Sequence, residues 1–395
     1  MFYRNIYKEL EKSLEAKQII ALTGLRRVGK TTAIKHLYKR IKSNNKIFLD
    51  LEKLENRSIF NTVRYDDIII SVEIEGIDFN TKGYIFLDEI QLINNIASVI
   101  KYIYDHYNIK FIVTGSSSFY MKGAFSESLA GRKRIFELFP LSFGEFLNFK
   151  GFTKLPKFNY QTTNQHFISK YISLYKEFIE FGGFPEVVLT KNREAKTALL
   201  KDILNSYIKF DILFLSDFTD IDEFYKVIKL LSSRVGSKVD YTKMSNISGI
   251  SRQKIKDYIL FLENSYFIKL VKPFVTNADR EIAKQKKLYF SDTGILNTFS
   301  NISTAAIFEN AIANQLSLLG NVNFYAKRTG QEIDFILDEK IAVEVKETAT
   351  AGDLITLNRR ANSINLKQTL LVALNAPGNN FNNYIFGGAI YWNNK

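Results

Sequence analysis

The sequence predicts an α/β protein of more than one domain, and three observations support this prediction. The chain has 395 residues, and domains commonly hold about 100–200 residues, so the length favours two or three domains. In the first 120 residues, short apolar runs alternate with helical patterns, which is typical of a parallel sheet with helices on both faces. From about residue 304, a helical pattern followed by apolar strands returns, which indicates a second α/β unit.

The composition excludes several classes of protein. Hydrophobic residues make up 46% and charged residues 24% of the chain, so disorder is excluded as the main state. The absence of cysteine excludes a disulfide scaffold, a zinc ribbon, an iron–sulfur site and a thiol nucleophile. The start has no signal-peptide core, and no apolar run reaches the roughly 18 residues that span a bilayer. We therefore expect a cytoplasmic protein without a membrane partner.

The charge is strongly positive, with a formal net value of +13. Either a polyanion partner or a genome biased towards lysine, asparagine and isoleucine would explain this total. Residues 231–290 hold twelve basic and five acidic side chains, a net of +7. More than half of the excess charge thus lies in one short stretch, which favours a basic surface and DNA as the partner.

The strands of the first unit are expected at residues 19–22, 47–50, 84–87 and 111–113, with a helix at 31–41. Each strand is a short continuous apolar run, as expected for strands buried on both faces. From about residue 141 to 221 the strand rhythm is lost and a mostly helical unit is expected. The run FGGFP breaks this unit in its middle.

The segment GLRRVGKT, which begins at Gly24, matches G-x-x-x-x-G-K-[ST] at every fixed position. It follows an expected strand and precedes an expected helix, which is the context that this phosphate-binding loop requires. Gly24 and Gly29 let the backbone wrap around phosphates at a helix amino terminus. Lys30 is expected to reach the β- and γ-phosphates, Thr31 to bind Mg²⁺, and Thr32 to line the same site. The cofactors expected are therefore ATP and Mg²⁺.

The expected strand YIFL is followed by two carboxylates, Asp88 and Glu89. Asp88 can hold the Mg²⁺ shell, and Glu89 can orient and polarise the attacking water in phosphoryl transfer. Hydrolysis, rather than binding alone, needs that second acid. A solvated acidic turn is the alternative, but its pairing with the phosphate loop favours an ATPase.

Two further candidates belong to the same site. Ser116 follows the strand at 111–113 and could sense the γ-phosphate, although a serine-rich turn explains the same run. Arg132, with Arg134 in reserve, could reach the γ-phosphate of a neighbouring subunit and stabilise transition-state charge. Solvated basic residues on a loop are the alternative. The arginine role requires a homo-oligomer, for which a hexameric ring is one form.

With these motifs on hand, the first 190 or so residues resemble an AAA+ ATPase of the archaeal and bacterial group with a GxRRVGKT loop. Members of this group also carry Leu-Asp-Glu-Ile-Gln at a strand end and a Thr-Gly-Ser-Ser turn, and the present sequence has both. It shares their PLSF run at 140–143 and GGFP run at 182–185 as well. The resemblance implies an AAA+ core with a helical lid. The lid has no clear second-sensor arginine, and Arg193 is the nearest candidate.

The basic stretch predicts a winged helix. Helices are expected at 222–236, 240–248 and 251–265, followed by strands at 267–271 and 287–290. In such a domain the third helix can enter the major groove while the wing meets phosphates. A protein-docking module is the alternative. The candidate DNA contacts are Arg252, Gln253, Lys256, Lys272 and Arg280.

The carboxyl-terminal unit carries a spaced set of acids. Glu309 lies on an expected helix, Asp334 on a strand, and Glu344 on the next strand two residues before Lys346. Strand alternation places Glu344 and Lys346 on one face. The three carboxylates can share a Mg²⁺ ion, and Lys346 can position a water for attack on a phosphodiester.

This set resembles the PD-(D/E)XK nuclease fold, which has a helical Glu, then an Asp, then Glu-x-Lys. The resemblance implies a restriction-endonuclease-like α/β domain with Mg²⁺-dependent cleavage of DNA. Two alternatives stay open. The acids could form a salt-bridged sheet face without a metal, or the fold could be retained for binding DNA without cutting it.

Four units are therefore expected: an AAA+ core at 1–150, a helical lid at 151–221, a winged helix at 222–292 and a nuclease-like domain at 293–395. We expect an ATP-hydrolysing, DNA-binding protein that acts in DNA processing, repair or defence, with a candidate nuclease site. The alternative is a nucleotide-gated regulatory switch or assembly factor whose nuclease-like domain binds but does not cut.

Overall fold

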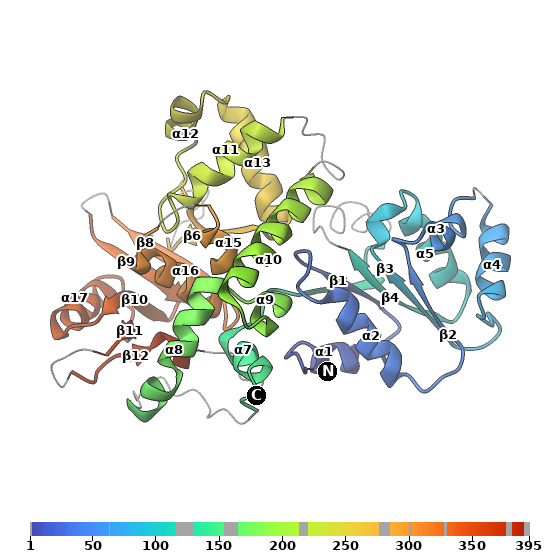
Figure 1. Ribbon diagram of the computed structural model, residues 1–395, viewed down its shortest axis with the longest axis horizontal. Coiled ribbons are helices and arrows are strands. Elements are labelled where there is room, and N and C mark those ends of the chain that lie inside the picture. Colours follow the sequence, from blue (N-terminus) through green and yellow to red (C-terminus); the bar gives the residue numbers. More distant parts are fainter. Residues whose placement is uncertain are drawn as a thin grey trace.

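The computed structural model describes residues 2–62, 64–115, 129–153, 165–212, 220–275, 285–299, 302–327, 330–376 and 381–390. Figure 1 shows two α/β units at opposite ends of the long axis, the amino-terminal one in blue and the carboxyl-terminal one in orange and red. A green helical segment lies between them. Two candidate residues, Ser116 and Arg280, lie outside the described residues.

The amino-terminal sheet consists of β2 (Lys46–Asp50), β3 (Gly83–Asp88), β4 (Ile109–Gly115), β1 (Ile19–Thr23) and β5 (Lys133–Glu137), in that spatial order. All neighbouring strands run parallel. Strands β1 and β4 are buried along their whole length, which explains their continuous apolar runs. The prediction of an α/β fold with a parallel sheet is confirmed.

Helices cover both faces of this sheet because successive side chains of a strand point to opposite faces. Ile20 of β1 shares a core with α1 (Tyr7–Ser13) and α2 (Lys30–Arg40). Its neighbour Ile19 shares a second core with α5 (Ile96–His106). The remaining elements of this unit are α3 (Leu54–Ser58), α4 (Tyr65–Ile74) and the short 3-10 helix η1 (Ile90–Leu92).

A helical segment follows the first sheet. It consists of α7 (Phe143–Phe149), α8 (Gln165–Phe181), α9 (Pro185–Leu189), α10 (Arg193–Ser206) and the π-helix η2 (Tyr207–Ile212). Helix α7 begins with a capping box, in which the side chain at its amino cap and the carboxylate three residues later each accept a backbone N–H. Proline at the first position of α9 fits a helix start, where its missing N–H has no helical partner.

Three helices and an antiparallel hairpin come next. They are α11 (Ile221–Ser232), α12 (Tyr241–Ser248), α13 (Arg252–Asn264), β6 (Ile268–Pro273) and β7 (Lys287–Phe290). Each helix has an aspartate or serine side chain that caps its amino end. A glycine with a φ of 73° ends α12 and makes the short turn into α13.

The carboxyl-terminal sheet has seven strands in the order β12-β11-β10-β9-β8-β6-β7, so it includes the hairpin that was expected to form the wing. Strand β6 pairs in parallel with β8. Helices α15 (Thr293–Asn297) and α16 (Thr304–Ser317) follow the hairpin. The other elements are β8 (Val322–Ala326), β9 (Glu332–Leu337), β10 (Ile341–Thr348), α17 (Ala351–Asn362), β11 (Gln368–Asn375), β12 (Ile385–Phe386) and η3 (Gly387–Ala389).

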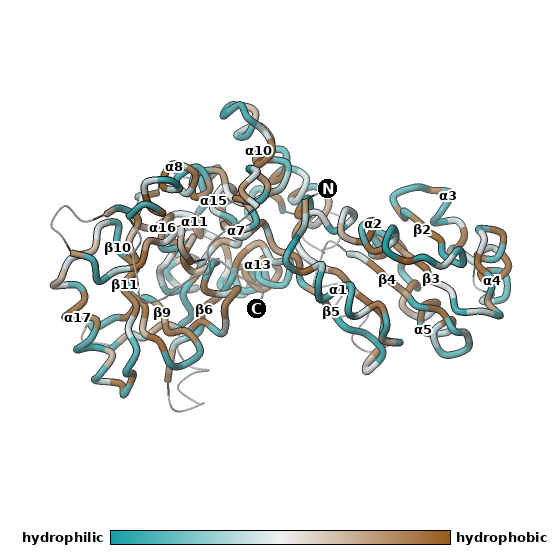
Figure 2. The backbone as a smooth tube through the Cα atoms, turned by 90° about the horizontal axis from the view of Figure 1, so that it is seen from below, coloured by the Kyte–Doolittle hydropathy of each residue, from teal (hydrophilic) through white to brown (hydrophobic). Residues whose placement is uncertain are grey.

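One hydrophobic core runs through most of the molecule. It includes side chains of α2, α8, α13 and β10, and therefore connects the two sheets through the helical segment. Figure 2 shows hydrophobic stretches along strands of both sheets and hydrophilic stretches on the outer loops. No helix in the described ranges is both long and apolar enough to cross a membrane.

Candidate functional site

The glycine-rich loop connects β1 to α2, where the sequence predicted it. Gly24 has a φ of 144°, and a Cβ there would lie 2.1 Å from the carbonyl oxygen of Leu138. Any other residue would therefore collide with the backbone of the segment that follows β5. Gly29 forms the amino cap of α2 with a φ of 100°, a conformation that glycine adopts without steric cost. The loop thus presents the amino terminus of α2 at the carboxyl edge of the sheet.

Lys30 lies across this loop and is 4% exposed. Its Nζ donates to the carbonyl oxygens of Gly24 and Leu25, at 3.1 and 2.9 Å. The next side chain, Thr31, is hydrogen-bonded to Asp88. Thr32 follows on the exposed surface of α2. The structure therefore brings Lys30, Thr31 and Asp88 together at one end of the sheet.

Asp88 ends β3 and is joined to β4 through a buried hydroxyl. The Oγ1 of Thr114 donates to Oδ1 of Asp88 and accepts the backbone N–H of Glu89 at 3.0 Å. Burial raises the pKa of Asp88, and the hydrogen bonds from Thr114 and Thr31 oppose that rise. The two acids at the end of β3 are therefore fixed by one threonine of the neighbouring strand.

Glu89 has a left-handed backbone, with φ and ψ of 58° and 51°. This conformation is strained for a residue with a Cβ, and such strain gathers at functional sites. The carboxylate of Glu89 also accepts a hydrogen bond from the side-chain amide of Gln91. The left-handed backbone turns the chain sharply after β3. The hydrogen bond from Gln91 holds the Glu89 carboxylate in place.

The negative charge around Asp88 suits a cation. Asp50 lies opposite Asp88 on the adjacent strand. Burial and the negative charge of Glu89 raise the pKa of Glu52, which follows β2. Oxygen ligands with surplus negative charge are what Mg²⁺ prefers, together with phosphate oxygens. Thr31 and Asp88 therefore fit the Mg²⁺ of a bound nucleotide.

The sequence analysis did not single out Thr114, whose hydroxyl contacts Asp88 and the backbone of Glu89. Ser116, which was expected to sense the γ-phosphate, lies outside the described residues. The sequence contained a signal for Thr114, because this polar residue directly follows the apolar run 111–113. The strand order β3-β4 places the ends of these two strands side by side. That order could not be read from the sequence.

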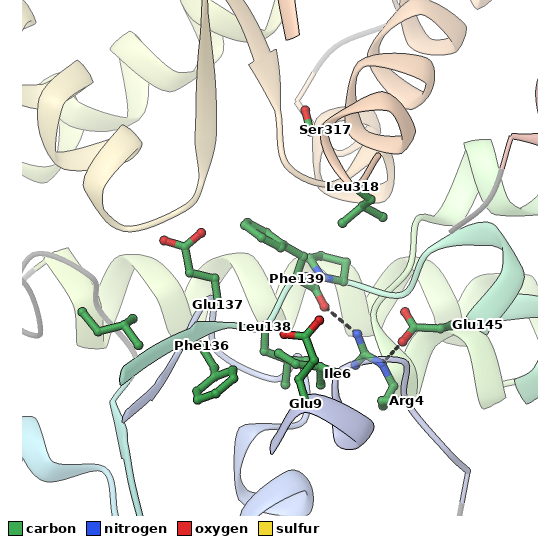
Figure 3. A pocket seen from close by; sticks show the side chains of 12 residues that line it. Arg4, Ile6, Glu9, Phe136, Glu137, Leu138, Phe139, Glu145, Ser317 and Leu318 are labelled. Atoms are coloured by element: carbon green, nitrogen blue, oxygen red, sulfur yellow. Dashed lines mark hydrogen bonds and ion pairs between the residues drawn. The ribbon is translucent and has the colours of Figure 1, made fainter. Parts of the chain in front are cut away.

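The buried side chain of Arg4 supports the glycine-rich loop, and the sequence analysis did not single it out. It is 5% exposed, and its Nε contacts Oε1 of Glu145 at 2.8 Å. Its two terminal nitrogens donate to the carbonyl oxygens of Val28, in the loop, and Phe139, at 3.0 and 2.9 Å. Figure 3 shows Arg4 between Glu145 and Phe139 at the edge of a cavity of about 450 Å³. The pair therefore fastens the loop to the start of the helical segment.

The helical segment also touches the loop directly. The guanidinium of Arg26 lies over the ring of Phe210 in η2, 5.0 Å from its centroid. Arg27 lies 3.8 Å from the carboxylate of Glu186 in α9. Arg193, the second-sensor candidate, is mostly exposed and pairs with Glu180 in α8.

Arg132 lies at the opposite edge of the sheet from the loop. Its carbonyl oxygen accepts the N–H of Ile19, the first residue of β1. Its guanidinium forms two contacts with Asp105, of 2.8 and 3.1 Å. The reserve candidate, Arg134, donates to Oγ of Ser13. A role for Arg132 at an ATP site needs a second subunit and stays a prediction.

The carboxyl-terminal acids lie near one another as expected. Glu309 is on α16, Asp334 on β9, and Glu344 and Lys346 on β10. Burial, and then the charge of Asp334, raise the pKa values of Glu309 and Glu344, that of Glu309 to about 7. Asp334 accepts the N–H of Val345, and Lys346 donates to Glu344, both at 2.8 Å.

The arrangement of these acids gives no support for a bound metal ion. Across the described ranges, no three histidine, cysteine, aspartate or glutamate side chains are placed to hold one. The assignment of Glu309, Asp334 and Glu344 to Mg²⁺ stays a prediction. A lysine of β7, which the sequence did not single out, lies among the acids instead.

The candidate DNA contacts lie on two elements. Arg252, Gln253 and Lys256 are exposed in the first turns of α13. The side chain of Gln253 donates to Asp257 at 3.0 Å. Lys272 is exposed on β6. Their assignment to DNA stays a prediction.

Two family models match parts of the chain. Residues 16–147 match an AAA domain, and residues 172–306 match a domain of unknown function, DUF8612. The first match covers the five-stranded sheet and the loop between β1 and α2. This part of the chain is therefore similar to an AAA domain, as the sequence predicted.

Two relatives that match over most of the chain carry the name uncharacterised protein. One is protein MJ1544 of Methanocaldococcus jannaschii, 29% identical over 346 residues, covering 84% of this chain and 75% of that protein. Another, from Haemophilus influenzae, is 25% identical over 357 residues and covers 86% and 85% of the two chains. Among solved structures, the Aeropyrum pernix ORC1 protein in complex with DNA has 12% identity and a TM-score of 0.33, over 74% of this chain and 91% of that one. A likeness at this TM-score says nothing further about this chain.

The fold and the loop together define a P-loop-like α/β unit at the amino-terminal end, and this unit is the part of the chain that is similar to an AAA domain. Parallel strands, the loop between β1 and α2, and the acids after β3 are its parts.

Proposed function

We propose that the protein is an ATP-hydrolysing, DNA-binding protein of the AAA+ type. The observation that carries this proposal is the contact of Thr114 with both Asp88 and the backbone of Glu89. A chain that only bound nucleotide would need Asp88 for the cation but no second acid held beside it. The fixed position of Glu89 therefore supports hydrolysis.

The residues of the loop would act in a definite way. The N–H groups at the start of α2 would receive phosphate oxygens, and Lys30 would exchange its contacts with the Gly24 and Leu25 carbonyls for them. Thr31 and Asp88 would hold Mg²⁺, which neutralises phosphate charge when bound. Glu89 would accept a hydrogen bond from the attacking water and orient it. Arg132 would act only in a homo-oligomer, because it lies at the far edge of its own sheet.

For DNA binding we propose the three helices α11 to α13 with the β6–β7 hairpin as a winged helix. Its third helix exposes Arg252, Gln253 and Lys256, and the whole stretch is strongly basic. Phosphate contacts by such side chains would give a binding affinity that falls steeply with salt. DNA processing, repair and defence against foreign DNA are the settings that this combination fits.

Substitution of Glu89 tests the proposed hydrolysis. The variant Glu89→Gln keeps the size of the side chain and one acceptor oxygen but cannot polarise the water. ATP turnover should fall by about 100-fold or more, while ATP affinity stays within about threefold of the wild type. Turnover that is unchanged in this variant would refute the role of Glu89.

A nucleotide-gated switch is a second candidate function. It is favoured by the contacts of Arg26 with Phe210 and of Arg27 with Glu186, because they link the loop to the helical segment. Phosphates arriving in the loop would alter these contacts and move the helices. A slow turnover that no DNA changes, together with a nucleotide-dependent change in the protease sensitivity of η2, would favour this function.

A further inference from the structure

Lys287 of β7 occupies the middle of the acidic cluster. It is 3% exposed, and its Nζ contacts Oε1 of Glu332 and lies 3.7 Å from Oε1 of Glu309. The charge of Asp334 also acts on it. An ammonium group surrounded in this way satisfies carboxylates that would otherwise repel one another.

Two further cationic side chains contact Glu344, while its Oε2 and the Nε of Arg360 are buried without a hydrogen-bond partner among the described residues. Glu344 contacts Lys346 at 2.8 Å and Arg360 at 3.5 Å. The guanidinium of Arg360 also donates to the carbonyl oxygen of Glu332 at 2.7 Å. Three cationic side chains, Lys287, Lys346 and Arg360, thus lie among the four carboxylates of Glu309, Glu332, Asp334 and Glu344.

We propose that Lys287 is the resident cation of this cluster, so that the cluster holds no divalent metal and does not cut DNA by a metal-dependent route. A divalent ion needs several carboxylate or water oxygens within about 2.0–2.6 Å. The Lys287 ammonium lies between Glu309 and Glu332. There it repels a divalent ion and occupies the carboxylate oxygens that the ion would need. The inference concerns a different site from the ATP-binding loop and does not rest on the proposed function.

The cluster then has a structural task. Lys287 belongs to β7, Glu309 to α16 and Glu332 to β9, so its contacts join the hairpin to a helix and a strand of the carboxyl-terminal unit. Tyr289 of β7 adds a hydrogen bond to Glu309 at 2.7 Å. Gly236 faces the same carboxylate, since a Cβ there would lie 3.1 Å from its Oε1. The acids therefore fasten the hairpin to the sheet beside it.

Binding of Mn²⁺ to the nucleotide-free, full-length protein tests the inference. Electron paramagnetic resonance counts bound Mn²⁺ and needs no enzymatic activity. Wild-type protein should bind no Mn²⁺ at this cluster, so Asp334→Asn should leave its Mn²⁺ binding unchanged. Lys287→Met, which keeps most of the length of the side chain but removes its charge, should gain one Mn²⁺. The double variant Lys287→Met/Asp334→Asn should lose that ion again.

Lys340→Met is the matched control, because Lys340 is an exposed lysine on the turn between β9 and β10. It should behave as the wild type does. A wild-type protein that binds Mn²⁺ and loses it with Asp334→Asn would overturn the inference. A folded Lys287→Met variant that gains no ion would overturn it too.

Circular dichroism shows whether Lys287→Met is folded. Should that variant not fold, the comparison of wild type with Asp334→Asn decides alone, and a DNA-nicking assay adds a second readout. Mg²⁺-dependent nicking by the wild type that disappears in Glu344→Ala would contradict the inference. Neither outcome bears on ATP hydrolysis, which is measured at the other end of the molecule.

Discussion

At the scale of single residues, the proposed ATP site depends on buried side chains that the loop motif does not contain. Thr114 fixes the two acids after β3, and Arg4 holds the loop through the carbonyl oxygen of Val28. Neither residue would touch the phosphates. Their effect on activity would come from the positions that they give to Glu89 and the loop.

Thr114→Val removes the hydroxyl and keeps the shape of the side chain. Hydrogen bonds to charged groups contribute about 1.5–3 kcal/mol, so we expect turnover to fall by about 10- to 100-fold. ATP affinity should change little, and Thr114→Ser should restore most of the activity. A Thr114→Val variant with wild-type turnover would show that the hydroxyl does not position Glu89.

Arg4→Met leaves the carboxylate of Glu145 buried without its cation. Loss of one partner of a buried ion pair costs about 3–5 kcal/mol, which should appear in urea-induced unfolding. The double variant Arg4→Met/Glu145→Gln removes both charges but keeps an acceptor oxygen for the capping box of α7, and it should recover part of that stability. Equal stability of the single variant and the wild type would contradict the importance of the pair.

At the scale of elements, the turn between α8 and α9 packs closely against two other segments, one that contains Asp292 and one that contains Leu141. A Cβ on Gly182 would lie 2.1 Å from Oδ1 of Asp292, and one on Gly183 would lie 2.4 Å from the carbonyl oxygen of Leu141. The Asp292 carboxylate accepts the N–H of Gly183 at 2.7 Å and caps α15 through Ile295 at 3.0 Å. Both positions of the GGFP run that hold glycine therefore have no room for a Cβ, because backbone and carboxylate atoms lie too close.

Gly183→Ala should destabilise the protein by about 1–3 kcal/mol, because overpacking against backbone atoms cannot be relieved by a side-chain rotation. Gly352→Ala is the matched control. Its Cβ would meet only Oγ1 of Thr350 at 3.7 Å, an ordinary contact, and alanine favours the helix α17 that contains it. Urea unfolding measures both, and equal effects would refute the close contact at Gly183.

Asp292 also predicts a dependence on pH. Burial raises the pKa of Asp292 from its ordinary value of 3.8 to about 6. The folded protein therefore keeps a proton there that the unfolded chain releases, so this group makes stability decline as the pH rises from about 4 to about 6. Relative to Asp292→Asn, the wild type should lose about 2–3 kcal/mol over that range. A difference between the two proteins that is constant with pH would contradict the shifted pKa.

The sequence predicted the secondary-structure elements more completely than the contacts between them. Four of the five strands of the amino-terminal sheet could be predicted because each contains a continuous apolar run, and the loop because its fixed residues fall within eight positions. The fifth strand, β5, has the sequence KRIFE, in which charged residues outnumber apolar ones, and it was not predicted. The ion pair of Arg4 with Glu145 could not be predicted, since its partners lie 141 positions apart. Lys287 was expected as part of a strand, but nothing in its neighbours indicates that it faces Glu309 and Glu332.

At the scale of the whole molecule, the parts are joined rather than separate. The β6–β7 hairpin, expected as a wing, is continuous with the carboxyl-terminal sheet through the pairing of β6 with β8. That parallel pairing depends on tertiary packing and leaves no mark in the sequence. Strand β7 carries Lys287 into the acidic cluster, and Asp292 two residues after its end meets the turn between α8 and α9. Movements of the helical segment would therefore reach the hairpin.

The measurement that tests the central claim most directly is ATP turnover by the full-length protein with duplex, single-stranded and branched DNA, at one fixed salt concentration. Phosphate contacts weaken as salt rises, so stimulation should decline when the salt is increased. We expect at least one form of DNA to raise turnover several-fold, and Glu89→Gln to abolish the response. ATP that is bound but turned over slowly, and equally with every DNA, would contradict the account.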